Sequence, residues 1–380
     1  MPLIKLGGPG ALFWMWLAAF FGMATKYAEG CLAVKFRDVD ANGNISGGPM
    51  YYIEMGLGKK WKPLAVAFSI FGVMTAMLGS GTTTQMNAII SSVYAGFGVS
   101  TYITCAIITI LVAIITFGGL QSISNTASKI VPAMAVIYFV LTVIFLGMNA
   151  GELPRAVSEV IEGAFNGTAA AGGFAGATIM LTLRSGIARG LYSNESGLGS
   201  APIVAAAAKT KWPAEQGLIS MTGTFIDTII ICTLTGLTII VSGVWMGPEN
   251  GAAMTQSAFA TSYGRMAPYI LTISLTLFAF TTIIGWNYYG ERCWAYLFGT
   301  KTIKLYRIGY IIILASAVFI KLEAIWALAD IVNGLMAIPN LIALLGLSGI
   351  IVEETKKYFS HLEIRDAKLK AYKARRIGKK

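Results

Sequence analysis

The sequence is poor in charge and almost without histidine. Only 12% of its 380 residues are charged, and its single histidine, His361, lies near the C-terminal end. Four cysteines occur, and all fall in or at the ends of apolar segments, which argues against a disulfide framework and against a zinc site. They are Cys31, Cys105, Cys232 and Cys293. We therefore expect neither a transition-metal site nor a catalytic histidine within the apolar part of the chain.

Hydrophobic residues make up 56% of the chain and occur in runs of roughly 20 residues or more. Such runs suit membrane-spanning helices better than the buried strands of a soluble α/β enzyme. The net charge of +11 is concentrated near predicted helix ends and in the last 25 residues. In a membrane protein that distribution indicates the cytoplasmic side and not nucleic-acid binding. The sequence predicts an all-α polytopic membrane protein.

The stretch from Gly186 to Ala208 combines several glycines and Pro202 with the polar run Ser193, Asn194, Glu195 and Ser196. A helix in lipid cannot contain so many helix-breaking residues without exposing backbone groups. Unwound backbone at membrane depth has to line a cavity or be buried in protein. We therefore expect a discontinuous transmembrane helix whose free N–H groups, carbonyls and dipole ends meet at a binding site.

About nine transmembrane helices are expected. They cover about 10–34, 63–97, 102–117, 130–148, 174–208, 217–243, 268–298, 306–320 and 324–352. The first ends in Lys26, Glu29, Lys35 and Arg37, a basic end that we expect at the cytoplasmic face. The second is expected to be one long helix with an internal polar patch.

Three further segments are an expected interfacial helix, the last span and the C-terminal tail. Residues 152–165 mix acids with apolar residues, which favours an interfacial helix on the outer side. The segment 324–352 forms either one helix bent at Pro339 or two short ones, and the charge rule favours one. The basic tail 356–380 is then cytoplasmic, either as a helix at anionic headgroups or as a solvated disordered tail.

The order of elements suggests an internal repeat within a transporter domain covering residues 1–355. One span, a long span with a polar patch and two more spans precede the broken segment, and the same order follows it. Inverted repeats with paired broken helices are typical of secondary transporters. We expect a first repeat over about 7–150, which lacks its own broken helix, and a second over about 172–352.

Several blocks of the sequence resemble the alanine or glycine:cation symporter family, amino-acid transporters of the leucine-transporter-like (LeuT) fold. The blocks are GGPGALFWMWLAAFFG at 7–22, ISGGPMYYI at 45–53, ARGLYSNESGLGSAP at 188–202, GWNYYGERCW at 285–294 and DIVNGLMAIPNL at 330–341. The family has two further helices at the front, the second with a GTGN-type break. Relative to the family, the chain is therefore expected to be truncated at its N-terminus.

The resemblance implies a substrate site at the break. Gln85 resembles the family's pocket glutamine and would hydrogen-bond the substrate, although a Gln bridging two helices is the alternative. Residues 193–197 would supply backbone and side-chain groups to the substrate and to a cation, whereas glycine-mediated helix packing is the structural alternative. Trp286 would cap the pocket and restrict it to very small side chains, unless it is plain packing. The expected substrate-binding residues are Gln85, Ser193, Asn194, Glu195, Ser196, Gly197 and Trp286.

The resemblance also implies a sodium site at Thr281 and Thr282, since hard oxygen ligands suit an alkali cation. Threonine bonding within its own helix is the structural alternative. Asp227 is expected as a second cation ligand, a proton carrier or the ion-pair partner of Arg184 or Arg189, with the ion pair slightly favoured.

Two more pairs of polar residues are expected near the ends of spans. Glu291 and Arg292 resemble an inner-gate pair near the cytoplasmic end of their span. Asp330 and Asn333 share a helix face and would brace the core.

The leading hypothesis is secondary symport of alanine or glycine with a cation by alternating access at the cell membrane. Sodium is the expected coupling ion and the proton is the alternative. An intramembrane enzyme is disfavoured, because no nucleophile–histidine pair or paired aspartates on facing spans are present. The remaining alternative is a non-transporting remnant or a subunit whose partner supplies the missing helices.

Overall fold

The computed structural model describes residues 2–40, 43–166, 175–249, 251–320 and 322–377. These residues are mostly helical and include one antiparallel hairpin, in which Asp38 pairs with Ser46 and Val39 with Ile45. The first part contains α1 (Pro2–Gly7), α2 (Ala11–Lys35), β1 (Asp38–Val39), β2 (Ile45–Ser46), α3 (Pro49–Tyr52), η1 (Ile53–Leu57), η2 (Lys59–Trp61), α4 (Lys62–Leu78), α5 (Thr83–Phe97), α6 (Thr101–Phe117), α7 (Gly119–Met148), η3 (Ala150–Glu152) and α8 (Leu153–Asn166).

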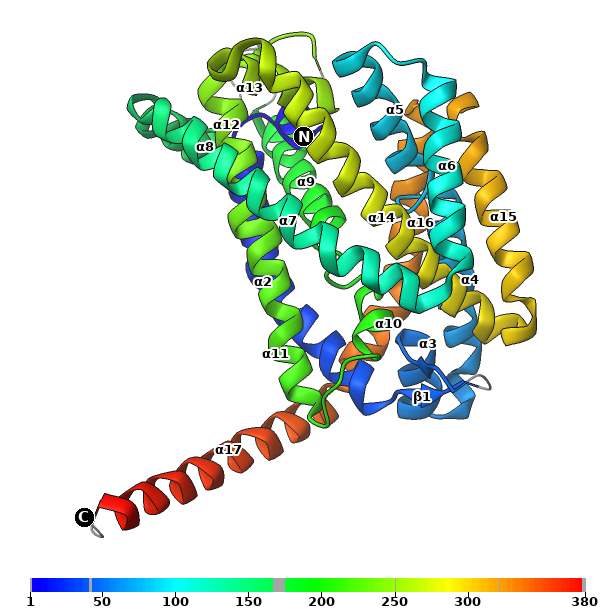
Figure 1. Ribbon diagram of the computed structural model, residues 1–380. Helices are drawn as coiled ribbons and strands as arrows, with labels where there is room; N and C mark the ends of the chain where they lie inside the picture. Colours follow the sequence, from blue (N-terminus) through cyan, green and yellow to red (C-terminus); the bar gives the residue numbers. More distant parts are fainter. Residues whose placement is uncertain (1, 41–42, 167–174, 250, 321, 378–380) are drawn as a thin grey trace.

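The second part begins with the expected broken segment. It contains α9 (Ala175–Asn194), α10 (Ala201–Ala205), α11 (Pro213–Thr224), the π-helix η4 (Phe225–Cys232), α12 (Thr233–Ser242), η5 (Val244–Met246), α13 (Gly251–Tyr263), η6 (Gly264–Met266), α14 (Ala267–Phe298), η7 (Thr300–Thr302), α15 (Ile303–Ser316), η8 (Ala317–Phe319), α16 (Leu322–Gly346) and α17 (Ser348–Ile377). Figure 1 shows α17 projecting away from the body of the molecule.

Six helical segments within the described residues are long and apolar enough to cross a membrane. They are Lys59–Phe97, Gln121–Met148, Pro213–Ser242, Tyr269–Phe298, Thr300–Phe319 and Ala327–Gly346. The other three expected spans correspond to α2, to the 17-residue α6 and to the interrupted pair α9 and α10. The chain is thus a polytopic helical membrane protein.

The second expected span, 63–97, lies within the single candidate span Lys59–Phe97, but its helix is not continuous. The structure ends α4 at Leu78 and begins α5 at Thr83, so the polar patch contains an interruption. Only the expectation of an unbroken helix was wrong, because the hydroxyl-rich segment after Gly79 can satisfy part of its own backbone, as described below.

At the other end of the chain, α16 continues through Pro339, which confirms one helix over the alternative of two short ones. The tail is helical, and α17 begins at Ser348, ahead of the expected boundary at 356.

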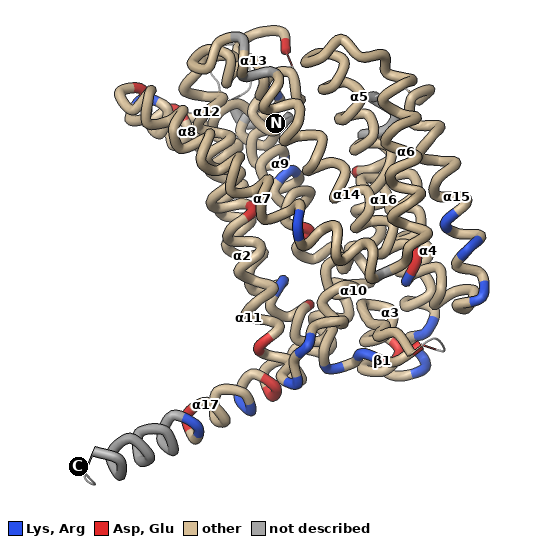
Figure 2. The backbone as a smooth tube through the Cα atoms, in the orientation of Figure 1, with Lys and Arg blue, Asp and Glu red and all other residues tan. Residues whose placement is uncertain are grey.

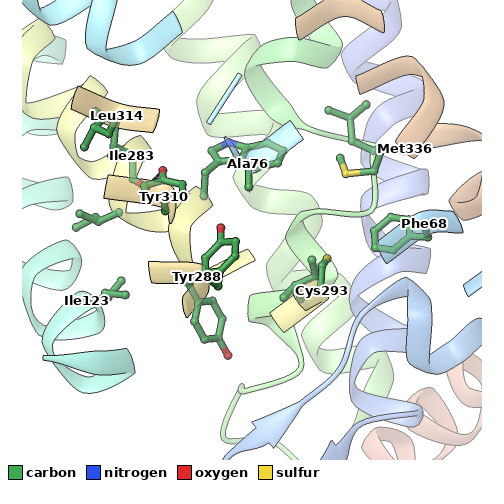
Figure 3. Packing of buried hydrophobic residues seen from close by; sticks show 14 of the residues in the cluster. Phe68, Ala76, Ile123, Ile283, Tyr288, Cys293, Tyr310, Leu314 and Met336 are labelled. Atoms are coloured by element: carbon green, nitrogen blue, oxygen red, sulfur yellow. Dashed lines mark hydrogen bonds between the residues drawn. The ribbon is translucent and has the colours of Figure 1, made fainter. Parts of the chain in front are cut away.

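Elements of the first part of the chain pack against elements of the second part. α2 lies along α11 and α9, α14 crosses α4 and α5, and α15 packs on α6. Two clusters of buried apolar residues fill these contacts, one around α4, α14 and α15 and the other around α2, α7 and α12. Figure 3 shows Phe68 and Met336 together with Ile283 and Tyr310 in the larger cluster. Leu198, within the interruption between α9 and α10, belongs to the larger cluster.

Charged side chains are unevenly distributed along the molecule. Figure 2 shows Lys and Arg gathered at the end where β1, α3 and the start of α17 lie, while few charged residues occur in the middle of the bundle. The helices around that middle expose large apolar side chains such as Phe20, Ile110 and Ile312. A lipid-facing surface accounts for such exposure in a chain with long apolar helices.

Candidate functional site

The predicted interruption of the broken helix is present between Asn194 and Ala201. Glu195, Gly197 and Gly199 all have positive φ, at 56°, 84° and 83°. At Gly199 a Cβ would lie 2.7 Å from atoms of both Phe68 and Pro49, so this position requires glycine for space as well as for conformation. The loop therefore runs through a tight, buried passage between neighbouring helices.

Charged residues of α2 satisfy the backbone of this loop. Lys26 donates from Nζ to the carbonyl of Asn194 at 2.7 Å. Oε1 of Glu29 accepts the N–H groups of Gly197 at 3.1 Å and Gly199 at 3.0 Å. The sequence grouped Lys26 and Glu29 with the basic end of the first span, and the structure buries both of them against the loop. Two charges three residues apart in an apolar helix were the signal that could have identified them.

Asn340 of α16 completes the set of contacts on the loop. Its Nδ2 donates to Oε1 of Glu29 at 2.7 Å and to the carbonyl of Gly197 at 3.0 Å. Its Oδ1 accepts a short hydrogen bond from the Tyr52 hydroxyl. The loop is thereby tied to α2, α3 and α16 together.

The polar side chains of residues 193–196 make two kinds of contact. Asn194 donates to Thr228 of η4 at 3.0 Å, and the hydroxyls of Ser196 and Thr224 are 3.1 Å apart. Ser193 instead donates to Asp227 at 2.7 Å. Asn194 and Ser196 hence tie the loop to α11 and η4, whereas Ser193 lies beside an acid.

A cavity of about 350 Å³ opens beside the loop. It brings together six of the predicted residues, Gln85, Ser193, Glu195, Asp227, Thr282 and Trp286. A neighbouring cavity of about 940 Å³ is also lined by three of these and adds Thr281. Asn194, Ser196 and Gly197 are held by the contacts described above and are not among the lining residues of either cavity.

Both threonine hydroxyls at the cavities also bond within α14. Thr281 donates to the carbonyl of Phe278 at 2.9 Å, and Thr282 donates to the same carbonyl at 2.9 Å. These bonds use the hydroxyl hydrogens and leave oxygen lone pairs for a cation. The local bonding and the predicted ligand role are compatible.

Asp227 lies on the π-helical turn η4, a type of irregularity that occurs frequently at functional sites. Its Oδ2 accepts hydrogen bonds from Ser193 at 2.7 Å and from Thr228 at 2.9 Å. Arg189 bonds to Asp330 at 3.2 and 2.9 Å. The favoured ion pair of Asp227 with Arg184 or Arg189 is therefore corrected: Asp227 has hydroxyl partners, and Asp330 takes the arginine.

Glu291 and Arg292 form a buried ion pair at 2.9 Å near the C-terminal end of α14. Arg292 also contacts Asp40, beside the hairpin, at 2.9 Å, and Arg307 of α15 contacts Glu291 at 2.7 Å. The sequence pointed to the adjacent pair but not to Asp40 or Arg307. The network joins α14 to the next helix, α15, and to the hairpin region, which is distant in sequence.

Among the residues that the structure describes, no group of three histidine, cysteine or acidic side chains is placed to hold a metal ion. Apart from the guanidinium of Arg189, which is paired with Asp330, the polar groups that line the smaller cavity are mainly oxygens and include two carboxylates. Such a lining suits an ammonium group or an alkali cation, both of which prefer carboxylate, hydroxyl and carbonyl oxygens.

Comparison with known proteins extends over almost the whole chain. The model of the sodium:alanine symporter family matches residues 3–372. An uncharacterized transporter of Haemophilus influenzae is 53% identical over 363 residues, covering 95% of this chain and 79% of the relative.

Two further relatives carry functional names. The sodium/alanine symporter AgcS of Methanococcus maripaludis is 47% identical, over 93% of this chain and 78% of its own length. The probable sodium/glutamine symporter GlnT of Bacillus subtilis is 37% identical, over 93% of this chain and 73% of its own length.

Proposed function

Since this chain belongs to the sodium:alanine symporter family, we propose that it carries alanine or glycine together with sodium across the cell membrane. The family and the named relatives indicate an amino-acid/cation symporter. The choice of substrate and ion is the proposal. The observation that carries it is the small cavity at the helix break, where two carboxylates, an amide, hydroxyls and an indole converge.

We assign the amino-acid site to this cavity. Gln85 donates to the carbonyl of Ser80 at 3.1 Å, and its amide oxygen is left to accept the substrate's ammonium group. Ser193 and Glu195 add oxygen acceptors from the other side. Trp286 packs edge-on against Tyr289 and closes the space available to a side chain, which favours alanine and glycine over larger amino acids. Asn194, Ser196 and Gly197 do not line the cavity, and their role in this proposal is to hold the loop in the shape that positions Ser193 and Glu195.

We assign the sodium site to Thr281, Thr282 and Asp227. The hydroxyl oxygens of α14 and the carboxylate of η4 lie on helices that face the broken segment. Alkali cations in membrane proteins bind where such oxygens replace their hydration shell. Sodium binding then favours the conformation that receives the amino acid, so the two bindings are coupled by linkage.

The architecture supports a LeuT-like core with repeats over about 7–150 and 172–352. α2, α4 with α5, and α6 precede the broken helix, and α11 with α12, α14 and α15 follow it in the same order. Corresponding members pack on each other, as expected of two repeats related by a pseudo-two-fold axis. Alternating access would rock one bundle against the other around the break.

The gate and the membrane orientation follow from the charges. The network of Glu291, Arg292, Asp40 and Arg307 would close the inner side and has to separate when the site opens inward. It lies at the end of the molecule where Lys and Arg gather, which the positive-inside rule assigns to the cytoplasm. The basic α17 would then also lie on the cytoplasmic side.

Uptake into proteoliposomes tests the proposal. The protein is purified at the length that its host makes, as defined by intact mass and N-terminal sequencing. We expect uptake of radiolabelled alanine that requires an inward sodium gradient and is competed by unlabelled glycine. Uptake driven equally well by a proton gradient without sodium would overturn the choice of ion, and no uptake of either amino acid would overturn the choice of substrate.

A matched pair of variants tests the sodium site. Thr282→Val removes a cavity hydroxyl and should raise the sodium concentration for half-maximal uptake by about tenfold, the effect of losing about 1.4 kcal/mol of binding. Thr126→Val removes a hydroxyl that bonds in the same way to its own helix, to the Ser122 carbonyl at 2.8 Å, but lines neither cavity. It should leave the sodium dependence unchanged. Equal effects of the two variants would contradict the assignment.

A further inference from the structure

Two charged side chains of α2 lie against opposite ends of the helix break. Lys26 is 8% exposed and Glu29 is 1% exposed. Burying an ammonium and a carboxylate at membrane depth is expensive unless each is paired and hydrogen-bonded, and such residues are usually functional. Neither residue belongs to the substrate or sodium site proposed above.

The two charges match the polarity of the backbone that they contact. The last carbonyls of a helix have no partner within it and carry partial negative charge, and Lys26 bonds to the carbonyl of Asn194, the last residue of α9. Successive N–H groups in a loop with positive φ form a concave site for an anion. Glu29 fills that site at Gly197 and Gly199.

Lys26 also lies beside the binding cavity, because it bonds to the carbonyl of Asn194, which stands between two residues that line the cavity, Ser193 and Glu195. At this place its ammonium is near enough to interact electrostatically with the carboxylates of Glu29, Glu195 and Asp227. The last two line the cavity, and Asp227 is a ligand in the proposed sodium site. The positive charge of Lys26 therefore lies near the carboxylates of Glu195 and Asp227, which would attract a mobile cation.

We propose that Lys26 is a fixed internal cation and Glu29 its counter-charge, a pair of positioning residues that holds the break in its binding geometry and sets the affinity for sodium. The proposal rests on the symport proposed above. Because the two charges have opposite signs, removing one or the other should shift sodium binding in opposite directions. A purely structural role would weaken binding in both cases.

Sodium titrations of alanine uptake distinguish these outcomes. Lys26→Met should lower the sodium concentration for half-maximal uptake by about threefold to tenfold, the range expected for a unit charge acting through an effective dielectric constant of about 20. Glu29→Gln, which keeps one acceptor oxygen, should raise that concentration by a similar factor. The double variant should return near the wild-type value. A shift in the same direction for both single variants would overturn the proposal.

Lys35 and Glu354 supply the matched control. Lys35 lies on the same helix and forms an ion pair with Glu354 of α17 at 2.8 Å, away from the break. Lys35→Met and Glu354→Gln should leave the sodium titration unchanged. Lys26→Arg keeps the charge and should also titrate like the wild type. It covers the case in which Lys26→Met fails to fold, and a shift in Lys26→Arg as large as threefold would count against a role of charge.

A second readout does not depend on transport. Cys232 lines the cavity and lies 3.3 Å from the hydroxyl of Ser193. In a background with Cys31, Cys105 and Cys293 replaced by alanine, alkylation of Cys232 by a small maleimide should be at least about threefold faster in Glu29→Gln, because the loop loses charge-assisted bonds. Lys35→Met should react like the parent. Unchanged alkylation in Glu29→Gln would overturn the positioning role, whereas absent uptake by the wild type would overturn the symport proposal alone.

Discussion

The two interruptions in the transmembrane helices are satisfied by different means. Between α4 and α5 some hydrogen bonds reach other helices, such as those from Tyr310 of α15 to the Gly81 carbonyl at 3.3 Å and from Ser80 to Asn333 of α16 at 3.1 Å. Most of the bonds are nevertheless local: Thr83 donates to the carbonyl of Leu78 at 3.1 Å, and Thr84 donates to the carbonyl of Ser80 at 3.0 Å. Thr82 likewise bonds to the carbonyl of Ala76. Between α9 and α10, the backbone is instead hydrogen-bonded by charged side chains of α2 and by the Asn340 amide of α16.

This difference determines whether each break can change shape when the surrounding helices move. Hydroxyls that bond to carbonyls a few residues earlier keep a local geometry wherever the helix goes. A glycine-rich loop whose partners lie on other helices changes shape when those helices move. We therefore expect the α4–α5 break to be a rigid wall of the cavity and the α9–α10 break to respond to the movement of α2 and α16.

The largest expected effect comes from removing the carboxylate that holds the second break. Glu29→Leu leaves two loop N–H groups and the Asn340 amide without their acceptor and removes one of the carboxylates near the Lys26 ammonium. We expect a loss of about 3–5 kcal/mol in the free energy of unfolding, because several buried donors lose one charged acceptor together. Denaturation in mixed micelles measures it. A loss below about 1 kcal/mol, the scale of one ordinary hydrogen bond, would show that the two breaks do not differ.

The conformation of the second break gives the next largest effect. Gly199→Ala places a Cβ 2.7 Å from Phe68 and Pro49 at a residue with φ of 83°. We expect a loss of about 2–4 kcal/mol from crowding and left-handed strain together. Gly98→Ala is the matched control, since Gly98 has a φ of 68° but open space around its Cβ. It should cost about 1–2 kcal/mol from strain alone. Equal costs would mean that the loop is not tightly enclosed.

The first break should be more tolerant. Thr84→Val removes a hydrogen bond to the Ser80 carbonyl and the acceptor for the Tyr192 hydroxyl, which lies 3.0 Å away. Because the neighbouring hydroxyls still bond to the segment, we expect a loss of only about 1 kcal/mol. The same unfolding measurement applies. A loss as large as that of Glu29→Leu would contradict the idea of a self-satisfied break.

The smallest effect concerns the ion pair that attaches α17 to α2, outside the membrane core. Burial raises the pKa of the Glu354 carboxyl, but hydrogen bonds from Lys35 and Lys357 lower it further, so that the pKa lies below its ordinary value of 4.5. A depressed pKa means that the stabilisation is complete above 4.5 and is lost as the pH falls through the lower folded value. We expect on the order of 0.5–1 kcal/mol, since one partner is partly exposed.

A spin label at Phe359→Cys measures this release. It should become more mobile as the pH falls below 4.5, and Glu354→Gln should make the label mobile at every pH. Release of the helix at neutral pH in the unmodified chain would contradict the assignment. The binding cavity should not respond, because neither Lys35 nor Glu354 reaches it.

The sequence was informative where a signal is local. Glycine spacing and the polar run predicted the interruption at Glu195–Ser200, because positive φ and unpaired backbone groups are properties of the residues themselves. Long apolar runs likewise indicated the membrane helices. The α4–α5 interruption was missed, since threonine and serine are compatible with a continuous helix as well as with a broken one.

Partners across the bundle were beyond prediction. The proposed pairing of Asp227 with an arginine was reasonable from composition, yet the fold gives Arg189 to Asp330 and hydroxyls to Asp227. Asp40 and Arg307 were not identified as parts of the gate network because 251 and 16 residues separate them from Glu291 along the chain.

By itself, the sequence determined that this protein is a bundle of membrane helices with a broken helix rich in glycine and polar residues. Chain composition sets hydrophobic length and local backbone freedom, and these need no knowledge of neighbours. Only the tertiary structure decided that Lys26 and Glu29 hydrogen-bond to the backbone of the break. The energetic cost and the role of a buried charge depend on the groups that hydrogen-bond to it, and those groups come from helices that only folding brings together.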